Sequence, residues 1–297
     1  MPPRDTAYAL VTAIIWGLTF IAIRIGVEDA PPLALSALRF TFAALPAILF
    51  IQPPRASPML TALYGLLIGV GQFGVLFIAI ERGMPIGLVS LVIQLQAFVT
   101  VALAYFWFGE RLSRAALGGG ALALIGLCVI GYARYAGAAL GPFLLTLVAA
   151  CCWGLANIVG KRVGKIDMLA FTVWSSLAAP APLFLLSAIF EGDRLIPAIT
   201  QPTLRLALCV AALSVGGTLI GYGLWSRLLA VHPAAKVAPF ALLVPVVGMV
   251  SAYFIFGERF SAVEGFGGLL IMAGLVVNVF GESVIARSAA TRQSRGA

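Results

Sequence analysis

The chain has 297 residues, of which 62% are hydrophobic and 10% are charged, and its mean hydropathy is +1.07. A soluble domain of this composition would have no polar exterior, so the composition predicts that the solvent of the folded chain is lipid. The net charge of +8 is not gathered in basic runs interleaved with aromatic residues, which argues against a nucleic-acid partner. The four cysteines have no metal-ligand spacing and there is a single histidine, so we predict no disulfide, metal or cofactor.

Ten segments with few or no charges follow one another along the chain. Each is at or near the roughly 20 residues that a bilayer-spanning helix requires, and the connections between them are short and rich in proline and glycine. The first segment has no small-residue cleavage site, so we interpret it as an uncleaved helix. The sequence predicts an all-α membrane protein with ten transmembrane helices at 6–23, 33–51, 56–80, 86–108, 115–133, 136–160, 168–190, 206–226, 237–257 and 265–281.

Two sequence motifs each occur twice. Residues 105–113 (YFWFGERLS) return 148 positions later as residues 253–261 (YFIFGERFS). Residues 16–18 (WGL) return 137 positions later as residues 153–155. Two independent matches in the same order predict an internal duplication.

The duplication divides the ten helices into two five-helix repeats, which we place at residues 1–135 and 136–297. Because five is odd, the second repeat begins on the opposite side of the membrane, and the two repeats are inverted relative to each other. Inverted repeats around a central site are typical of secondary transporters, in which exchange of the two conformations opens the site to each side in turn. The sequence therefore indicates a carrier that works by alternating access.

Loop charges predict the orientation, because cytoplasmic loops hold an excess of Lys and Arg. With both termini in the cytoplasm, twelve cations fall on the cytoplasmic side and six on the outer side, where seven of the eleven acids also lie. The cytoplasmic cations are Arg4, Arg55, Arg111, Arg114, Lys161, Arg162, Lys165, Arg227, Lys236, Arg287, Arg292 and Arg295. The outer cations are Arg24, Arg82, Arg134, Arg194, Arg205 and Arg259.

The chain resembles the drug/metabolite transporter superfamily, in its EamA-type branch of paired five-helix repeats. One shared signature is the Trp-Gly motif followed by Arg24 in the first repeat and Lys161 in the second. Others are the Gly-Glu-Arg that ends the fourth helix of each repeat, residues 38–40 (LRF) in the second helix, and Pro245 in the ninth. The resemblance covers nearly the whole chain.

This resemblance implies a multi-pass transporter of the bacterial inner membrane that exports small metabolites. The chain looks most like bacterial exporters of amino acids, including those for aromatic amino acids. The resemblance implies a cavity between the first, third, fourth, sixth, eighth and ninth helices, with a small-molecule substrate and the lipid bilayer as partners, in a monomer or homodimer. An exporter of drugs or other metabolites is an alternative, and a membrane enzyme or lipid-handling protein is another. The sequence has no nucleophile elbow, phosphate-binding loop or metal cluster, so we predict that the protein is not an enzyme.

Uncharged polar side chains near the middle of several helices are candidates for the cavity wall, since lipid would leave their donors and acceptors unpaired. Hydrogen bonding between helices is the alternative role for each. Gln94 and Gln96 are two residues apart, or about 200° around a helix axis, so we expect at most one to face the cavity and favour Gln94. The polar candidates for substrate binding are Thr19, Gln72, Gln94 and Asn157.

Aromatic side chains supply the other candidates. Trp16 and Trp153 occupy matching positions in mid-membrane rather than in the headgroup belt where Trp accumulates. Core packing with one indole hydrogen bond and an aromatic wall for an apolar substrate are both open readings of these two residues. Thr19 and Phe20 share a helix face with Trp16. The aromatic candidates for substrate binding are Trp16, Phe20, Phe73, Trp153, Tyr222 and Trp225, and Phe77 could extend the same wall.

Arg39 is a charge inside a predicted span, at a depth of roughly 10 Å by helix geometry. We expect its side chain to reach outward to the interface or to cap a neighbouring helix, although an intramembrane ion is also a functional candidate. Its equivalent in the second repeat is Ser176, so the repeats differ here. No Asp or Glu lies in the middle of a span, which favours a neutral or zwitterionic substrate and transport without proton coupling.

Glycines mark two further features. Gly65 and Gly69 in the third helix, and Gly217 and Gly221 in the eighth, form small faces that predict close packing of these helices. The glycine of each Gly-Glu-Arg motif is predicted to end its helix, with the charged pair as a hinge and interfacial anchor.

The orientation is testable with reporter fusions. Fusions within residues 52–57 and 162–167 should report the cytoplasm, and a fusion at residues 192–193 should report the outer side, because the cation excess alternates in this way. Opposite readings at two or more of these loops would overturn the predicted orientation.

Overall fold

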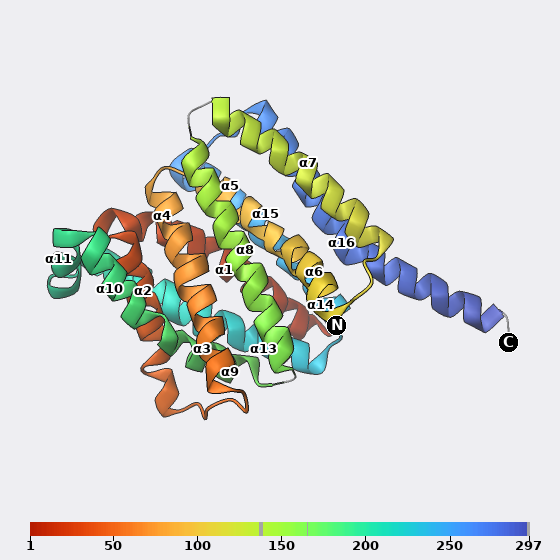
Figure 1. Cartoon of the computed structure of the whole chain (residues 1–297), viewed down its shortest axis with the longest axis horizontal. Coiled ribbons are helices and arrows are strands. Elements are labelled where there is room, and N and C mark those ends of the chain that lie inside the picture. The colour runs from red at the N-terminus through yellow and green to blue at the C-terminus, as the bar shows by residue number, and fades with distance from the viewer. Residues whose placement is uncertain (137–138, 165, 296–297) are drawn as a thin grey trace.

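The computed structural model describes residues 1–136, 139–164 and 166–295, with the backbone alone for residues 136, 234–235 and 282–295. All regular secondary structure in this part of the chain is helical (Figure 1), and ten helical segments are long and apolar enough to cross a membrane. The predicted ten-helix, all-α architecture is therefore confirmed. Of the cations assigned to the cytoplasm, those whose side chains lie outside the described part are Lys165, Arg287, Arg292 and Arg295.

Four spans consist of one continuous helix. The first span, which is continuous, and the second and third spans, which are not, all begin at a proline. A proline at the first helical position loses no hydrogen bond that the helix would have made. The continuous helices are α1 (Pro3–Asp29), α7 (Arg114–Ala136), α8 (Leu140–Val163) and α16 (Ala262–Arg295).

The other six spans are composite. The second span joins α2 (Pro32–Ala44) to a 3₁₀ turn at Ala47–Leu49. Similar turns join α5 (Ile86–Val92) to α6 (Gln96–Phe108) and α9 (Met168–Ser175) to α10 (Pro180–Phe190). Wider π-helical turns join α3 (Pro58–Leu66) to α4 (Val75–Glu81) and α12 (Leu204–Ala211) to α13 (Gly221–Val231). The ninth span is α14 (Ala234–Ala241) with α15 (Leu243–Phe256), and a short helix, α11 (Leu195–Thr200), precedes the eighth span.

The two π-helical segments lie at equivalent places in the two repeats. They span Leu67–Gly74 and Ala212–Ile220, and they contain Gly69 and Gly217, which are 148 positions apart. π-helical turns occur mostly as single turns and are often found at functional sites. Hydropathy alone does not predict them, because the wider turn keeps the segment helical and apolar.

Helix packing repeats with the sequence. A Cβ atom built on Gly17 of α1 would lie 2.5 Å from the Cβ atom of Val247 in α15. In the same way, a Cβ atom on Gly154 of α8 would lie 2.8 Å from the Cβ atom of Val99 in α6. The members of these two pairs are related by the 137- and 148-residue offsets of the sequence motifs. The first helix of each repeat therefore packs against the fourth helix of the other repeat.

Helices α7 and α16 lie side by side at the edge of the molecule (Figure 1). Their backbones come close at two glycine pairs, since a Cβ atom on Gly119 would lie 2.5 Å from the Gly274 oxygen and one on Gly126 would lie 2.4 Å from the Gly267 oxygen. Small residues allow this approach, and in lipid such packing is a main source of helix association.

The small faces of the third and eighth spans contact other helices. A Cβ atom on Gly65 or Gly69 would collide with Ser175 or Ala179 of the seventh span, at 1.9 Å and 2.2 Å. A Cβ atom on Gly217 would lie 2.9 Å from the side chain of Thr19 in α1. The predicted close packing thus joins the third span to the seventh and the eighth span to the first.

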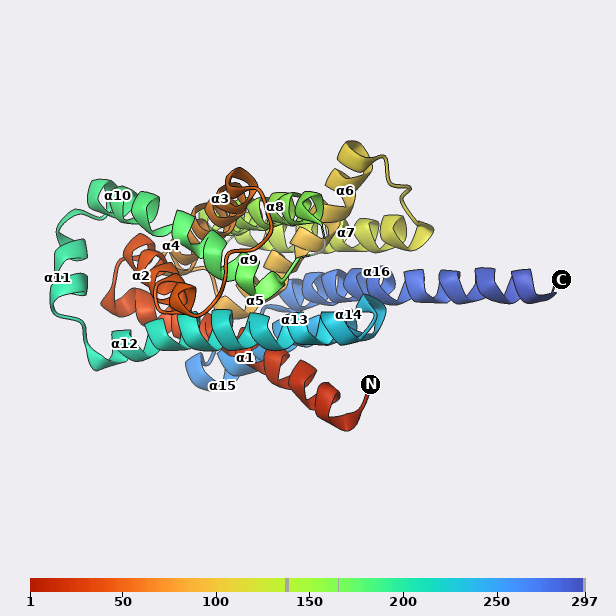
Figure 2. The ribbon, with the colours of Figure 1, turned by 90° about the horizontal axis from the view of Figure 1, so that it is seen from below.

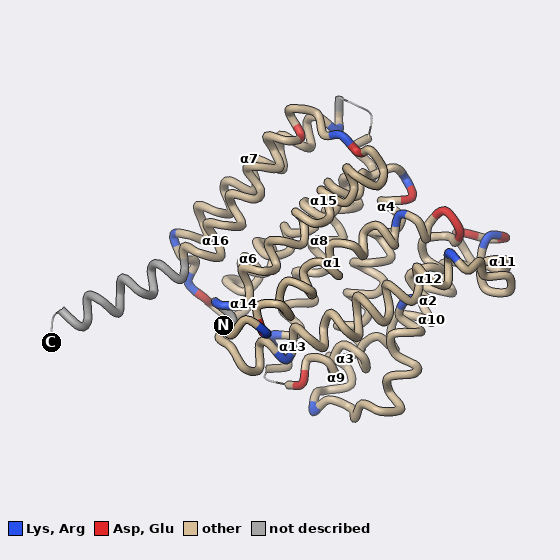
Figure 3. The backbone as a smooth tube through the Cα atoms, turned by 180° about the vertical axis from the view of Figure 1, so that it is seen from behind, with Lys and Arg blue, Asp and Glu red and all other residues tan. Residues whose placement is uncertain are grey.

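Charges gather at the two ends of the helices, and the middle is mostly apolar (Figure 3). Both termini lie toward one end, opposite α11 (Figure 2), which we call the terminal end, and the other is the far end. At the far end Arg194 pairs with Glu81 at 2.7 Å and Arg205 pairs with Glu28 at 3.2 Å. At the terminal end His232 contacts Asp5 at 2.7 Å, which places the close of α13 beside the start of α1.

A pair of neighbouring glycines tests the α7–α16 contact. Gly119→Ala should lower stability by about 1–3 kcal/mol, since its methyl group would meet a backbone oxygen that cannot rotate away. Gly118→Ala is the matched control, because nothing lies within 4 Å of a Cβ atom there and alanine favours the helix. The measurement is the melting temperature in detergent, and equal melting temperatures for both variants would contradict the contact.

Candidate functional site

A cavity of about 310 Å³ lies among the helices, within the size range of small-molecule sites. All ten residues predicted for substrate binding line it, although they come from five different spans. They are Trp16, Thr19, Phe20, Gln72, Phe73, Gln94, Trp153, Asn157, Tyr222 and Trp225. The structure therefore brings the whole predicted set together, and its role in binding remains a prediction.

Two more spans contribute to the wall than the resemblance implied. Arg39 enters from α2 of the second span and Met168 from α9 of the seventh. Tyr64 and Ser226 line the cavity as well, from the third and eighth spans. The sequence analysis took its candidates from mid-membrane positions, and it therefore missed Met168, which begins its span, and Tyr64, the seventh residue of Pro58–Glu81.

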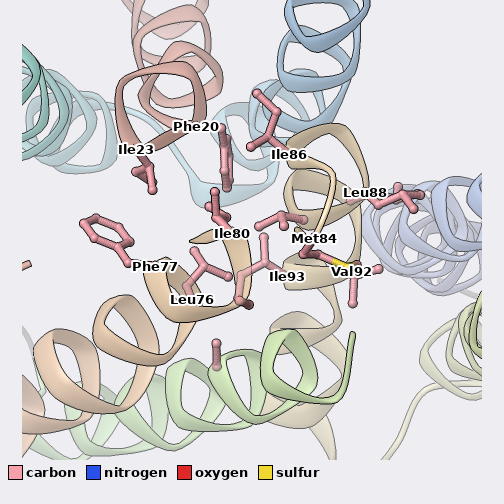
Figure 4. Packing of buried hydrophobic residues seen from close by; sticks show 14 of the residues in the cluster. Phe20, Ile23, Leu76, Phe77, Ile80, Met84, Ile86, Leu88, Val92 and Ile93 are labelled. Carbon is pink, nitrogen blue, oxygen red and sulfur yellow. The ribbon is translucent and has the colours of Figure 1, made fainter. Parts of the chain in front are cut away.

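The cavity is closed toward the far end. Ile23, Leu76 and Ile93 form its floor and are buried. Beyond the floor lies a packed layer of apolar side chains (Figure 4), in which the largest fully buried members are Phe77, Ile80, Ile86 and Leu88. Phe77, which the sequence suggested as a possible wall residue, belongs to this layer and not to the cavity lining.

Toward the terminal end the lining residues are less buried. Met168 and Trp225 are partly exposed and Leu229 is exposed. The preceding residue of α13, Leu228, packs on Ala9 near the start of α1, which fixes this part of the cavity at the terminal end. The cavity thus leads from a sealed far end toward the terminal end.

Trp16 is the centre of the aromatic wall. Its ring centroid lies 5.3 Å from that of Tyr222 and 5.2 Å from that of Trp225, in tilted arrangements that aromatic pairs favour. Its indole N–H donates to the Gly217 carbonyl oxygen at 3.0 Å. Trp16 therefore packs with one indole hydrogen bond and also lines the cavity, and its contact with an apolar substrate stays a prediction.

The two glutamines correct a sequence expectation, because both Gln94 and Gln96 line the cavity. The chain forms a 3₁₀ turn at Ile93–Leu95, where each residue advances about 120° rather than 100°, so residues two apart differ by about 240°. The shorter angle between them is then about 120°, and a broad cavity can contact both. The Oε1 atom of Gln96 also accepts from Asn157 Nδ2 at 2.7 Å, so Asn157 combines a place in the wall with an interhelical bond.

Arg39 corrects a second expectation. Its side chain neither reaches the interface nor caps a helix, since Arg39 is 3% exposed and lines the cavity. The guanidinium lies over the ring of Phe73, 3.6 Å from the centroid. The rule that an intramembrane charge is functional by default would have found it from the sequence.

A carboxylate from one repeat caps a helix of the other repeat at the far end. Glu258 accepts from the backbone N–H groups of Ile86 at 2.9 Å and Gly87 at 3.0 Å, where α5 begins. These N–H groups have no partner within the helix, and the helix dipole favours an anion there. The ring of Phe260 lies against Gly87, where a Cβ atom would come within 2.5 Å of it. Glu258 is thus a helix cap between the repeats and not only an interfacial anchor.

The equivalent carboxylate at the terminal end has a different partner. Glu110 pairs with Lys161, and both side chains are nearly half exposed. Each Gly-Glu-Arg glycine ends its helix as predicted, with φ of 65° at Gly109 and 66° at Gly257. The two copies of one motif therefore have the same backbone but different contacts.

Ten spans, an internal repeat and a central cavity sealed at one end define a multi-pass membrane transporter. The sequence profile of the EamA-like transporter family matches residues 6–132 and again 140–280. The chain belongs to this family, so it is a transporter of the inner membrane and not an enzyme.

Named relatives are similar over nearly their whole length. A probable amino-acid metabolite efflux pump of Salmonella typhimurium is 42% identical over 95% of this chain and 96% of its own. The protein of the same name in Escherichia coli is 40% identical over the same shares. A probable terminal-alkyne amino-acid exporter of Streptantibioticus cattleyicolor is 30% identical over 93% of this chain and 94% of its own.

A solved crystal structure has the same fold. Its TM-score is 0.58 at 22% identity, and the match covers 94% of this chain and 98% of the other. This likeness supports the arrangement of helices and nothing about substrate.

Proposed function

We propose that the protein exports amino acids with aromatic or large apolar side chains, by alternating access. The observation that carries this proposal is the cavity, which combines an aromatic wall with neutral polar groups and has no carboxylate among its described lining residues. The efflux-pump and exporter names of the relatives support the amino-acid class.

The lining favours this substrate class over lipophilic cations. A buried cation would need an acidic partner, and the charge that the cavity offers is Arg39, which repels it. Trp16, Tyr222 and Trp225 offer apolar faces with ring edges, which suit an aromatic or branched side chain. The described lining residues include no Asp or Glu that could carry a proton, so we propose that the substrate gradient drives export.

Alternating access would use the two repeats, 1–135 and 136–297, as two halves that exchange conformations. Gly69 and Gly217 lie in the equivalent π-helical turns, and these turns can change winding without losing the helix. With the predicted orientation, the cavity in this structure leads toward the cytoplasm, which is where an exporter takes up its substrate.

The two Gly-Glu-Arg motifs would act as alternate latches. Residues 85–87 and Glu258 have their repeat equivalents in residues 233–235 and Glu110, each 148 positions away. We propose that when the cavity opens outward, Glu258 leaves α5 while Glu110 leaves Lys161 and caps α14. The exposed Glu110–Lys161 pair is suited to this change, because surface ion pairs contribute only about 0–1 kcal/mol.

The substrate proposal predicts the outcome of counterflow in proteoliposomes without an ion gradient. Phenylalanine, tryptophan and leucine should exchange faster than glycine or lysine, and tetraphenylphosphonium should not exchange. Trp16→Ala should reduce phenylalanine exchange relative to leucine by about 2- to 10-fold, since an aromatic pair contributes about 0.5–1.5 kcal/mol. Exchange of the cation without any amino acid would refute the proposal, and a requirement for a pH gradient would refute the uncoupled mechanism.

The latch proposal predicts that Glu258→Gln, but not Glu110→Gln, opens the sealed layer at the far end. Reporter cysteines at Ile80 in the sealed layer and at Leu229 near the terminal end would be labelled in a background with the four native cysteines replaced. Glu258→Gln should raise labelling at residue 80 by about tenfold or more, because hydrogen bonds to a charged group contribute about 1.5–3 kcal/mol each.

Glu110→Gln provides the matched comparison. It should not raise labelling at residue 80, because Glu110 has no contact with the far end in this conformation. Parallel changes at residue 80 in both variants would show that the carboxylates act on stability in general and not as alternate latches.

A further inference from the structure

Arg39 has donors without acceptors. Its Nε and Nη1 atoms are buried and have no hydrogen-bond partner among the described residues. It lies in the second span, and 3% of its surface is exposed. An unpaired charge in such a place is strongly unfavourable, so a ligand that neutralises it would be bound favourably there.

The surroundings of Arg39 leave its donor edge available. The face of the guanidinium is covered by the Phe73 ring at 3.6 Å, and Phe40 lies 5.4 Å away. A cation over an aromatic face gains electrostatic attraction, but its N–H groups, which point along the guanidinium plane, remain unused. A carboxylate can accept hydrogen bonds from donors in this plane, where the guanidinium of Arg presents a fixed fork of N–H groups that the ammonium of Lys lacks.

Gln72 offers the complementary group in the same cavity. It is buried, and its Oε1 atom is a second polar atom with no hydrogen-bond partner. An unpaired acceptor and unpaired cationic donors in the wall of one cavity match a ligand that carries both an ammonium and a carboxylate. We propose that Arg39 binds the α-carboxylate of the transported amino acid and that Gln72 accepts a hydrogen bond from its α-ammonium. This assignment rests on the proposed function and specifies how its substrate is held.

The binding would be asymmetric between the repeats. The equivalent of Arg39 is Ser176, so one half carries the headgroup site in both conformations of the carrier. The side chain of the substrate would then extend toward Trp16 and Trp153, which also line the cavity.

A bound water is the simplest alternative partner for the unpaired N–H donors of Arg39. A recess of about 10 Å³ adjoins Arg39 and also borders Thr172, whose hydroxyl is unpaired, and it has room for one water. A water there can bond to Thr172 but does not neutralise a guanidinium. The two readings differ in whether an anionic group on the substrate matters.

The test compares phenylalanine with phenylalaninamide, which lacks the carboxylate, and with 3-phenylpropionate, which lacks the ammonium. Each would compete against labelled phenylalanine in proteoliposome counterflow. For the wild type, phenylalaninamide should compete about 10- to 100-fold more weakly than phenylalanine, as expected for hydrogen bonds to a charged group. In Arg39→Gln this ratio should fall to near one, and Arg39→Lys should restore part of it.

Two further variants make the test specific. Gln72→Leu should weaken phenylalanine and leave 3-phenylpropionate unchanged, because only the ammonium contact is lost. Arg227→Gln is the matched control, since Arg227 is also stacked on an aromatic ring, that of Tyr8 at 5.3 Å, but lies outside the cavity lining. Arg39→Gln should melt no lower than Arg227→Gln in detergent, because removal of an unpaired buried charge is not destabilising.

The outcomes separate the two proposals. If the wild type exchanges phenylalanine and Arg39→Gln keeps the wild-type ratio of phenylalanine to phenylalaninamide, the headgroup site is wrong and the proposed function stands. If the wild type neither exchanges an amino acid nor binds one, as measured by quenching of the cavity tryptophans, the headgroup site and the proposed function are both wrong. If Arg39→Gln folds normally and no longer distinguishes phenylalanine from phenylalaninamide, the result supports the headgroup site at Arg39.

Discussion

The constraint on which this structure depends is that lipid offers no hydrogen bonds. Every backbone and polar side-chain group within the membrane must find a partner inside the protein or in a cavity. The chain meets this demand with helices, and it uses carboxylates from other segments to pair the free N–H groups where helices begin. Glu258 serves α5 in this way, and Glu191 serves α2 by accepting from Leu33 at 2.8 Å and Ala34 at 3.2 Å.

The same constraint draws attention to the buried polar atoms that have no hydrogen-bond partner. The buried side-chain atoms that lack partners within the described chain belong to few residues, and Arg39, Gln72 and Thr172 among them border the cavity or its adjoining recess. A site that must take up and release a substrate repeatedly cannot satisfy its own polar groups fully, because those groups are what the substrate binds. This is why we propose that the unpaired atoms of Arg39 and Gln72 belong to the substrate site in the cavity.

The repeats explain both the symmetry and the asymmetry of the molecule. Gly17 with Val247 and Gly154 with Val99 show the same packing twice. The two Gly-Glu-Arg motifs, which are the most similar stretches of sequence, make different contacts in this conformation. A near-symmetric sequence in an asymmetric arrangement is what two interchangeable conformations would require.

The sequence by itself determined the ten helices, the duplication and the family, because hydropathy and repeated motifs act along the chain. It also identified ten of the cavity residues, the polar ones because lipid leaves their donors and acceptors unpaired. Only the tertiary structure decided that Arg39 stays buried over Phe73 and that Gln94 and Gln96 both reach the cavity. These outcomes depend on how neighbouring helices pack and on a 3₁₀ turn within one of them, and a uniform helical period contains neither.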